Sequence, residues 1–235
     1  MGIELWGRHV ARYAKEHGEL ASLVDMLREY QLAVPMISAS FDFVRDPDGS
    51  LETARRYLDY TKVFGAPLIR VFTGGGDSDK ASTATWRAVV SGLKKACALD
   101  QGVGFALETD SGHLHDTTES TLRLIRQTGM PNLCVNFDAA NLFEMGEDPA
   151  QALKRLLPWV RILHLKNGVT SGGKWRAAPF AEGDMDYPRF LKALSESSYG
   201  GYASVEWFGD DPTSAVVTEL AYLRRALGDK LEARA

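Results

Sequence analysis

Cysteine is scarce in this sequence, and that scarcity excludes a small scaffold held together by disulfides. The 235 residues include two cysteines, Cys97 and Cys134, which lie far apart and lack the spacing of a metal-binding pair. We expect both thiols to be buried apolar fillers, as is typical of proteins in a reducing compartment. We therefore predict a cytoplasmic location.

Long hydrophobic runs and an excess of positive charge are also missing. No uninterrupted apolar run is long enough to cross a bilayer, and the N-terminal stretch lacks the apolar core and cleavage site of a signal peptide. Acidic residues outnumber basic residues 31 to 27, so the net charge of −4 gives no general attraction to nucleic acid or anionic lipid. We expect no nucleic-acid partner and no membrane partner.

Short apolar runs alternate with amphipathic segments along the whole chain. The runs are rich in Val, Ile, Leu and Phe and mostly do not alternate with polar residues, which is typical of strands buried on both faces. They predict seven strands, at residues 2–6, 33–39, 68–72, 103–107, 133–137, 160–165 and 203–207.

The segments between these runs have helical periodicity, most clearly at residues 85–99, 120–127 and 188–195. Two of the helix starts carry residues typical of an N-cap. Ser50 and Asp186 fit that position, and a proline follows Asp186 inside the first turn.

Repeated strand–helix units predict parallel strands joined by right-handed crossovers within a single domain, residues 1–235. Two α/β architectures remain open at this point, a closed (β/α) barrel and an open doubly wound sheet. The glycines at 74–76 lack the second half of a nucleotide-binding fingerprint and indicate a flexible loop instead. That feature, together with charged residues at several strand ends, favours a TIM-type barrel.

A closed barrel of this type needs eight strands, and only seven can be counted. We therefore expect a TIM-type barrel that lacks the first strand–helix unit. Either the true start of the protein lies upstream, or the barrel is open. In an open barrel the edges of 2–6 and 203–207 have no partner, which favours a homo-oligomer.

An ionisable side chain lies within one residue of the end of each of the last four apolar runs. Because the carboxyl ends of parallel strands open on one face of a barrel, these four side chains should converge. Three crowded carboxylates repel one another unless a cation lies between them. We predict one divalent metal ion, with Mn²⁺ preferred over Mg²⁺, Co²⁺ or Zn²⁺ at such an oxygen-rich site. The predicted ligands are Glu108, Asp138, His164 and Glu206.

The chain resembles the sugar phosphate isomerase/epimerase family, also called xylose isomerase-like TIM barrels. The ordered set that carries this resemblance comprises residues 2–9, 106–109, 136–142, 164–167, 181–187 and 204–207. The resemblance implies a one-metal site made of the same four ligands. It also implies that Glu108 and Glu206 act as the acid/base pair found in ketose epimerases.

Three positions depart from the pattern that the resemblance implies. Asp110 and Asn141 stand where many members have histidine, and Asn167 replaces a usual aspartate. We expect these positions to surround the substrate, so the departures leave the metal ligands intact and leave the substrate open. Because the family includes inosose and dehydroshikimate dehydratases, the reaction class stays open as well.

Several polar residues near the expected mouth of the barrel are predicted to contact substrate. Lys166 shares the strand face of His164, although it could instead neutralise a ligand carboxylate. Arg176 and Trp175 are expected on a long loop that can act as a lid. The full set is Arg8, His9, Asn141, Lys166, Arg176 and Glu182, the last of which is implied by the resemblance.

Three further histidines are expected to lie outside the site. His113 and His115 form a His-x-His pair that could bind zinc, but the helix-starting residues that follow favour a surface loop. His17 lies in a polar stretch and is predicted to be exposed.

The predicted chemistry is the isomerisation or epimerisation of a small keto-sugar or polyol ketone. A divalent ion stabilises the enediolate, while Glu108 and Glu206 remove and return a proton. The alternatives are a metal-dependent dehydratase of a keto-polyol and a non-catalytic carbohydrate-binding barrel. A metal-dependent apurinic endonuclease is disfavoured, because the chain has five histidines and a negative net charge.

Overall fold

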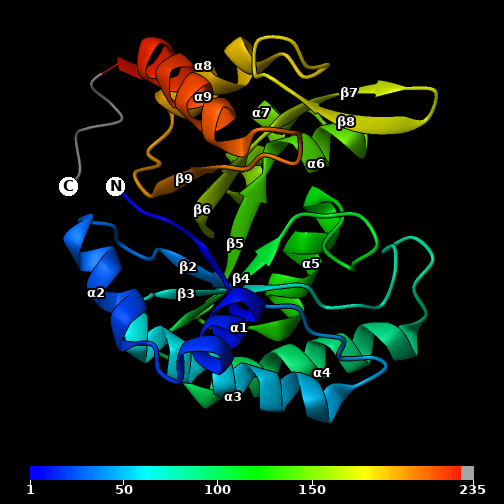
Figure 1. Ribbon diagram of the computed structural model, residues 1–235. Helices are drawn as coiled ribbons and strands as arrows, with labels where there is room; N and C mark the ends of the chain where they lie inside the picture. The colour runs from blue at the N-terminus through cyan, green and yellow to red at the C-terminus, as the bar shows by residue number, and fades with distance from the viewer. Residues whose placement is uncertain (229–235) are drawn as a thin grey trace. The chain divides into compact units, whose positions relative to one another are not determined.

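The computed structural model describes residues 1–228 (Figure 1). Seven parallel strands have the order β1-β2-β3-β4-β5-β6-β9, and β7 and β8 form a separate two-stranded sheet. This arrangement confirms the predicted α/β alternation with seven parallel strands. The chain divides into two compact units, Met1–Asn136 and Phe137–Ala235.

In the first unit, each strand pairs in parallel with the next strand in sequence. All residues of the second and third strands are buried, as expected for apolar runs without alternation. The first strand has two residues and is shorter than the predicted 2–6. The strands are β1 (Leu5–Trp6), β2 (Met36–Ser38), β3 (Leu68–Val71), β4 (Gly104–Glu108) and β5 (Leu133–Asp138).

The helices of this unit are α1 (Gly7–His17), α2 (Ala21–Glu29), α3 (Pro47–Phe64), α4 (Thr83–Leu99) and α5 (Thr118–Thr128). Two of them, α4 and α5, match the segments 85–99 and 120–127 predicted from periodicity, whereas α1 was not predicted. His17 is exposed, as predicted.

The prediction that Ser50 caps a helix is wrong, because α3 begins earlier. Asp46 is the cap, and its carboxylate accepts a hydrogen bond from the Gly49 N–H. Pro47 follows at the first helical position, where its missing N–H has no cost. The Ser50 hydroxyl instead accepts from the Asp42 N–H at 2.9 Å.

In the second unit, β6 and β9 pair in parallel, with Leu165 opposite Val205. Asp186 caps α8 through the Arg189 N–H, which confirms that prediction. The elements are α6 (Ala139–Glu144), α7 (Pro149–Leu156), β6 (Val160–Leu165), β7 (Asn167–Ser171), β8 (Lys174–Ala178), α8 (Tyr187–Glu196), β9 (Tyr202–Val205) and α9 (Pro212–Leu227).

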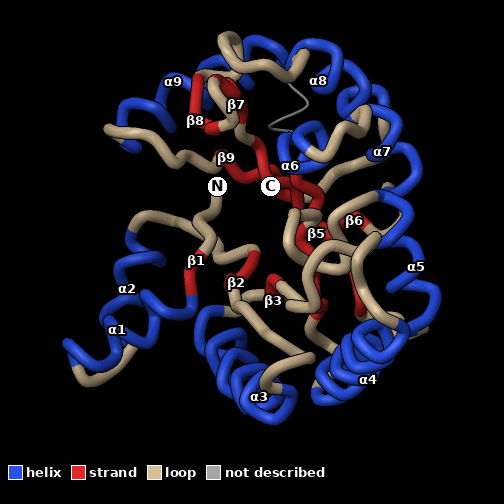
Figure 2. The backbone as a smooth tube through the Cα atoms, turned by 90° about the vertical axis from the view of Figure 1, so that its right-hand side faces the viewer, coloured by secondary structure: helices blue, strands red, loops and turns tan. Residues whose placement is uncertain are grey.

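The long loop predicted around Trp175 and Arg176 is in fact an antiparallel hairpin of β7 and β8 (Figure 2). Gly172 and Gly173 form its turn with φ angles of 58° and 73°. Two successive residues with positive φ match the twist of a two-residue hairpin turn, and glycine adopts that conformation without strain.

Cys97 and Cys134 are both buried thiols, which confirms their prediction as buried fillers. Burial, reinforced by the neighbouring Cys134, raises the pKa of Cys97 to about 12, so this thiol is protonated and unreactive. Within residues 1–228, no helix combines the length and apolar character needed to cross a membrane.

Gly92 marks a close approach between α4 and the loop that carries Phe43. A Cβ atom at Gly92 would lie 2.3 Å from the Phe43 ring, and both residues are buried. We expect Gly92→Ala to lower stability by about 1–3 kcal/mol through overpacking, although alanine normally favours a helix. Urea denaturation measures the change, with Ser91→Ala on the exposed face of α4 as the control. Stabilisation by Gly92→Ala would contradict this packing.

Candidate active site

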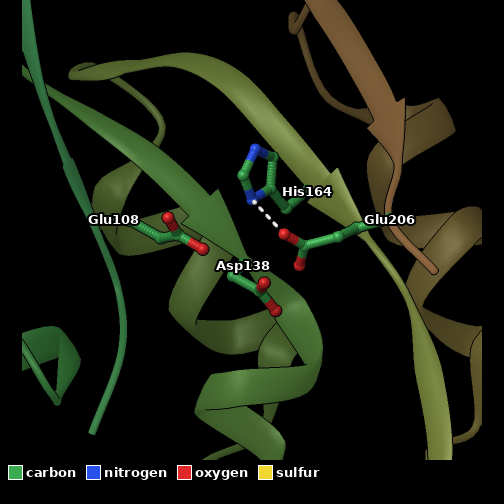
Figure 3. Close-up of side chains that lie close together, drawn as sticks. All are labelled: Glu108, Asp138, His164 and Glu206. Atoms are coloured by element: carbon green, nitrogen blue, oxygen red, sulfur yellow. Dashed lines mark ion pairs between the residues drawn. The ribbon is translucent and has the colours of Figure 1, made fainter. Parts of the chain in front are cut away.

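Three ionisable side chains lie at strand ends in the second unit. Asp138 is the last residue of β5, His164 lies near the end of β6, and Glu206 directly follows β9. The Nδ1 atom of His164 lies 3.9 Å from Oε1 of Glu206 (Figure 3). Asp138 and His164 are buried, whereas Glu206 is partly exposed.

Glu108 is the last residue of β4 and is almost fully buried. Strand register places it opposite Asn136, two residues before Asp138. One potential ligand atom from each of four residues lies within 4.8 Å of the others (Figure 3). The four residues are Glu108, Asp138, His164 and Glu206.

Lys166 lies next to two of these carboxylates. Its Nζ atom is 2.8 Å from Oδ2 of Asp138 and 2.9 Å from Oε2 of Glu206. Burial alone would lower the pKa of Lys166, but the charges of Asp138 and Glu206 outweigh burial and raise that pKa. The side chain is therefore a fixed positive charge. Its contacts match the second role considered from the sequence, in which Lys166 neutralises ligand carboxylates.

Arg70 is a second buried cation, and sequence reasoning missed it. Its Nη1 atom donates to Oε2 of Glu108 at 2.7 Å, and both side chains are buried. The guanidinium also lies 4.0 Å from the centre of the Phe72 ring. The available signal was one arginine in the otherwise apolar run 68–72.

His113 and His115 lie in a loop before α5, as predicted, but the prediction that this loop lies at the surface is wrong for His115. His115 is fully buried, and its Nδ1–H donates to the backbone carbonyl of Glu108. Burial lowers the pKa of His115 to about 3, so its imidazole is neutral. Burial also lowers the pKa of His113, whose ring stacks on Phe72 at 4.4 Å.

Two aspartates fasten this histidine loop to the loop after β3. Asp77 accepts from the Gly112 N–H at 3.0 Å, and Asp116 accepts from the Ser78 N–H at 2.8 Å. These contacts fix the backbone that follows Glu108. The glycines at 74–76, predicted to form a flexible loop, have positive φ angles, and Gly75 forms a β-bridge with His113.

Two of the predicted substrate residues lie on the first turn of α1. Arg8 and His9 are exposed, and both stack against Trp6, at 3.8 Å and 5.6 Å.

The other three lie in the second unit. The N–H of Asn141, in the first turn of α6, donates to Oδ1 of Asp138 at 2.9 Å. Arg176 lies on β8, and Glu182 is exposed in the turn after Pro179. A role in substrate binding stays a prediction for all of these residues.

Glu144 at the end of α6 is another residue that the sequence did not reveal. Burial raises the pKa of its carboxyl group, and the nearby Lys166 and a hydrogen bond from Trp175 oppose that shift. Trp175 also makes an edge contact with Phe208 at 6.3 Å, and Lys166 Nζ lies 5.2 Å from the Phe208 ring. The β7–β8 hairpin thereby contributes an aromatic side chain that packs against the Phe208 ring beside the buried lysine.

The donor set suits a small divalent ion. Three carboxylates and one imidazole offer hard oxygen ligands with a single nitrogen, and no thiolate belongs to the group. Such a set fits Mg²⁺, Mn²⁺ or Co²⁺ and accommodates Zn²⁺.

Comparison with known proteins gives a consistent assignment. A family model described as xylose isomerase-like TIM barrel matches residues 1–226. A 3-dehydroshikimate dehydratase from Bacillus anthracis is 27% identical over 94% of this chain and 86% of its own length. An L-ribulose-5-phosphate 3-epimerase from Shigella flexneri is 23% identical over 92% of this chain and 80% of its own. The crystal structure of a probable 3-DHS dehydratase from Bacillus anthracis superposes with a TM-score of 0.84 at 26% identity, covering 94% and 88% of the two chains.

The Arg70–Glu108 pair generates a stability prediction. Arg70→Met removes the cation beside a buried carboxylate, so we expect a loss of about 3–5 kcal/mol in the free energy of unfolding. Urea denaturation measures it. Arg126→Met is the matched control, since its pair with Glu119 is exposed and contributes little. Equal effects of the two substitutions would contradict the importance assigned to the buried pair.

Proposed function

Because the chain belongs to the xylose isomerase-like TIM barrel family, we propose that it is a divalent-metal-dependent dehydratase of a small polyhydroxylated carbonyl compound. The observation that carries this proposal is the compact group of three carboxylates and one imidazole at the strand ends. The similarity to a 3-dehydroshikimate dehydratase over nearly the whole chain supports dehydration as the reaction class.

The proposed ligands of one ion, Mn²⁺ in first place, are Glu108, Asp138, His164 and Glu206. When bound, the ion supplies positive charge that stabilises an enediolate. The charges of the chain agree with this role. The three carboxylates are partly balanced by Arg70 and Lys166, so a dication leaves the site with one net positive charge. A singly charged enediolate would complete the balance.

Glu108 and Glu206 are the proposed proton carriers. One carboxylate takes the proton from the carbon next to the carbonyl group. The hydroxyl group on the following carbon then leaves as water after it receives a proton. Buried surroundings exclude bulk water from Glu108, whereas the partly exposed Glu206 can exchange protons with solvent.

Epimerisation of a ketose is the second candidate. It shares the proton-abstraction step and differs in that the second carboxylate returns a proton to the opposite face of the same carbon. The similarity to an L-ribulose-5-phosphate 3-epimerase over 92% of the chain favours this candidate over a binding-only protein.

Metal binding should appear as a gain in thermal stability. We expect Mn²⁺ to raise the melting temperature and a chelator to reverse the rise, because an ion at 100 times its Kd adds about 2.7 kcal/mol to a folded protein. Differential scanning fluorimetry measures the shift. Asp138→Asn, which removes one ligand charge but keeps the side-chain shape, should abolish most of it. An unchanged shift in this variant would place the ion elsewhere.

Turnover distinguishes the two reaction classes. The Mn²⁺-loaded protein is incubated with 3-dehydroshikimate, an inosose and L-ribulose 5-phosphate, and mass spectrometry records either the loss of one water or isomerisation. We expect loss of water. Glu108→Gln and Glu206→Gln should each reduce turnover and deuterium exchange from D2O by at least about 100-fold, because each removes a proton carrier. Full exchange in both variants would refute their roles.

A further inference from the structure

We propose that Lys166 sets the ion selectivity of the site by restricting Asp138 and Glu206 to one ligand oxygen each. This inference rests on the metal binding proposed above. It assigns Lys166 a positioning role in place of the substrate contact expected from the sequence.

The contacts of Lys166 divide the oxygens of each carboxylate into two kinds. The ammonium group holds Oδ2 of Asp138 at 2.8 Å and Oε2 of Glu206 at 2.9 Å. The other oxygen of Glu206, Oε1, is the one that lies 3.9 Å from His164 Nδ1. In Glu206, the oxygen that Lys166 does not hold therefore faces another proposed ligand. In Asp138, the oxygen that Lys166 does not hold, Oδ1, accepts from the Asn141 N–H at 2.9 Å and keeps a second lone pair for an ion.

The ammonium group is well fixed in this position. Lys166 is 8% exposed, and the Phe208 ring lies 5.2 Å from its Nζ atom. Trp175 packs edge-on against Phe208. A lysine that is buried, paired with two carboxylates and flanked by an aromatic ring cannot swing away without leaving a buried charge uncompensated.

In the first unit, Glu108 likewise has one carboxylate oxygen in contact with a buried cation. Arg70 holds its Oε2 atom at 2.7 Å. In each of the three carboxylates, one oxygen therefore contacts a buried cation. Such carboxylates ligate an ion through a single oxygen, because bidentate ligation needs both oxygens to face the ion.

Single-oxygen ligation discriminates between divalent ions. Ca²⁺ takes six to eight oxygen ligands at longer distances and commonly uses bidentate carboxylates, whereas Mg²⁺ demands a compact octahedral shell. Zn²⁺ binds four ligands. A site that offers three single oxygens and one nitrogen therefore favours the smaller ions over Ca²⁺.

The charge of Lys166 and its positioning role have different signatures. Removal of one positive charge strengthens the binding of every dication by a similar factor. Release of a second oxygen from Asp138 and Glu206 strengthens Ca²⁺ binding in particular. The ratio of the two dissociation constants, Kd for Ca²⁺ over Kd for Mn²⁺, isolates the positioning role.

The test measures this ratio by calorimetry on the full-length protein and follows bound Mn²⁺ by electron paramagnetic resonance. We expect Lys166→Met to lower the ratio by at least about tenfold. Lys166→Arg, which retains a cation, should keep the ratio near that of the wild type. Lys174→Met is the matched control, because Lys174 is exposed on the β7–β8 hairpin.

The outcomes are separable. A ratio that stays constant while both affinities rise in Lys166→Met would overturn the positioning role and leave only a charge effect. Failure of the wild-type protein to bind either ion would instead overturn the proposed metal site, and this inference with it. Circular dichroism verifies that each variant folds. If Lys166→Met does not fold, Lys166→Gln replaces it, because its amide can donate to one carboxylate and should give a smaller fall in the ratio.

Discussion

Buried negative charge is the constraint on which this structure depends. Glu108 and Asp138 have almost no contact with solvent, and an isolated carboxylate in such surroundings is strongly disfavoured. Two buried cations of the chain, Arg70 and Lys166, contact the three carboxylates of the cluster. Because two cations offset three acids, one negative charge stays unbalanced, and a divalent ion reverses the sign of the site. The same feature therefore explains the local structure and supports the anionic intermediate of the proposed reaction.

Backbone register delivers the carboxylates to their places. Parallel pairing sets Glu108 opposite Asn136 and Leu165 opposite Val205, so each ionisable residue lies at or just beyond the end of its strand. Loop contacts then hold the backbone. The neutral His115 bonds the Glu108 carbonyl, and Asp116 bonds the neighbouring loop. A side chain on a fixed strand end loses little further entropy when it binds an ion. The rigid placement of these side chains thereby supports the proposed binding of an ion.

The sequence predicted those features that repeat or that interrupt a pattern. Apolar runs gave all seven parallel strands, and acids at their ends indicated the cluster. Partners separated by long stretches of chain left no such signal. Arg70 and Glu108 are 38 residues apart, and nothing local links them. The β7–β8 hairpin escaped prediction because only its first two residues are buried, so it carries no buried apolar run. His115 was misassigned because the helix-starting residues that follow it suggested a surface loop, although tertiary packing buries it completely.

The pKa values of the side chains near the site limit which groups can carry a proton in the proposed reaction. Asp110 and Asn141 stand at two positions where histidine was expected from the family resemblance. The two histidines that follow β4 do not replace them, because burial lowers the pKa values of His113 and His115 and keeps both imidazoles neutral. Lys166 has a raised pKa and retains its proton. In the proposed reaction, proton transfer near neutral pH therefore falls to carboxyl groups. Carboxyl groups suit proton abstraction from a carbon beside a carbonyl, and a divalent ion held by the four proposed ligands would stabilise the negative charge that such a step creates.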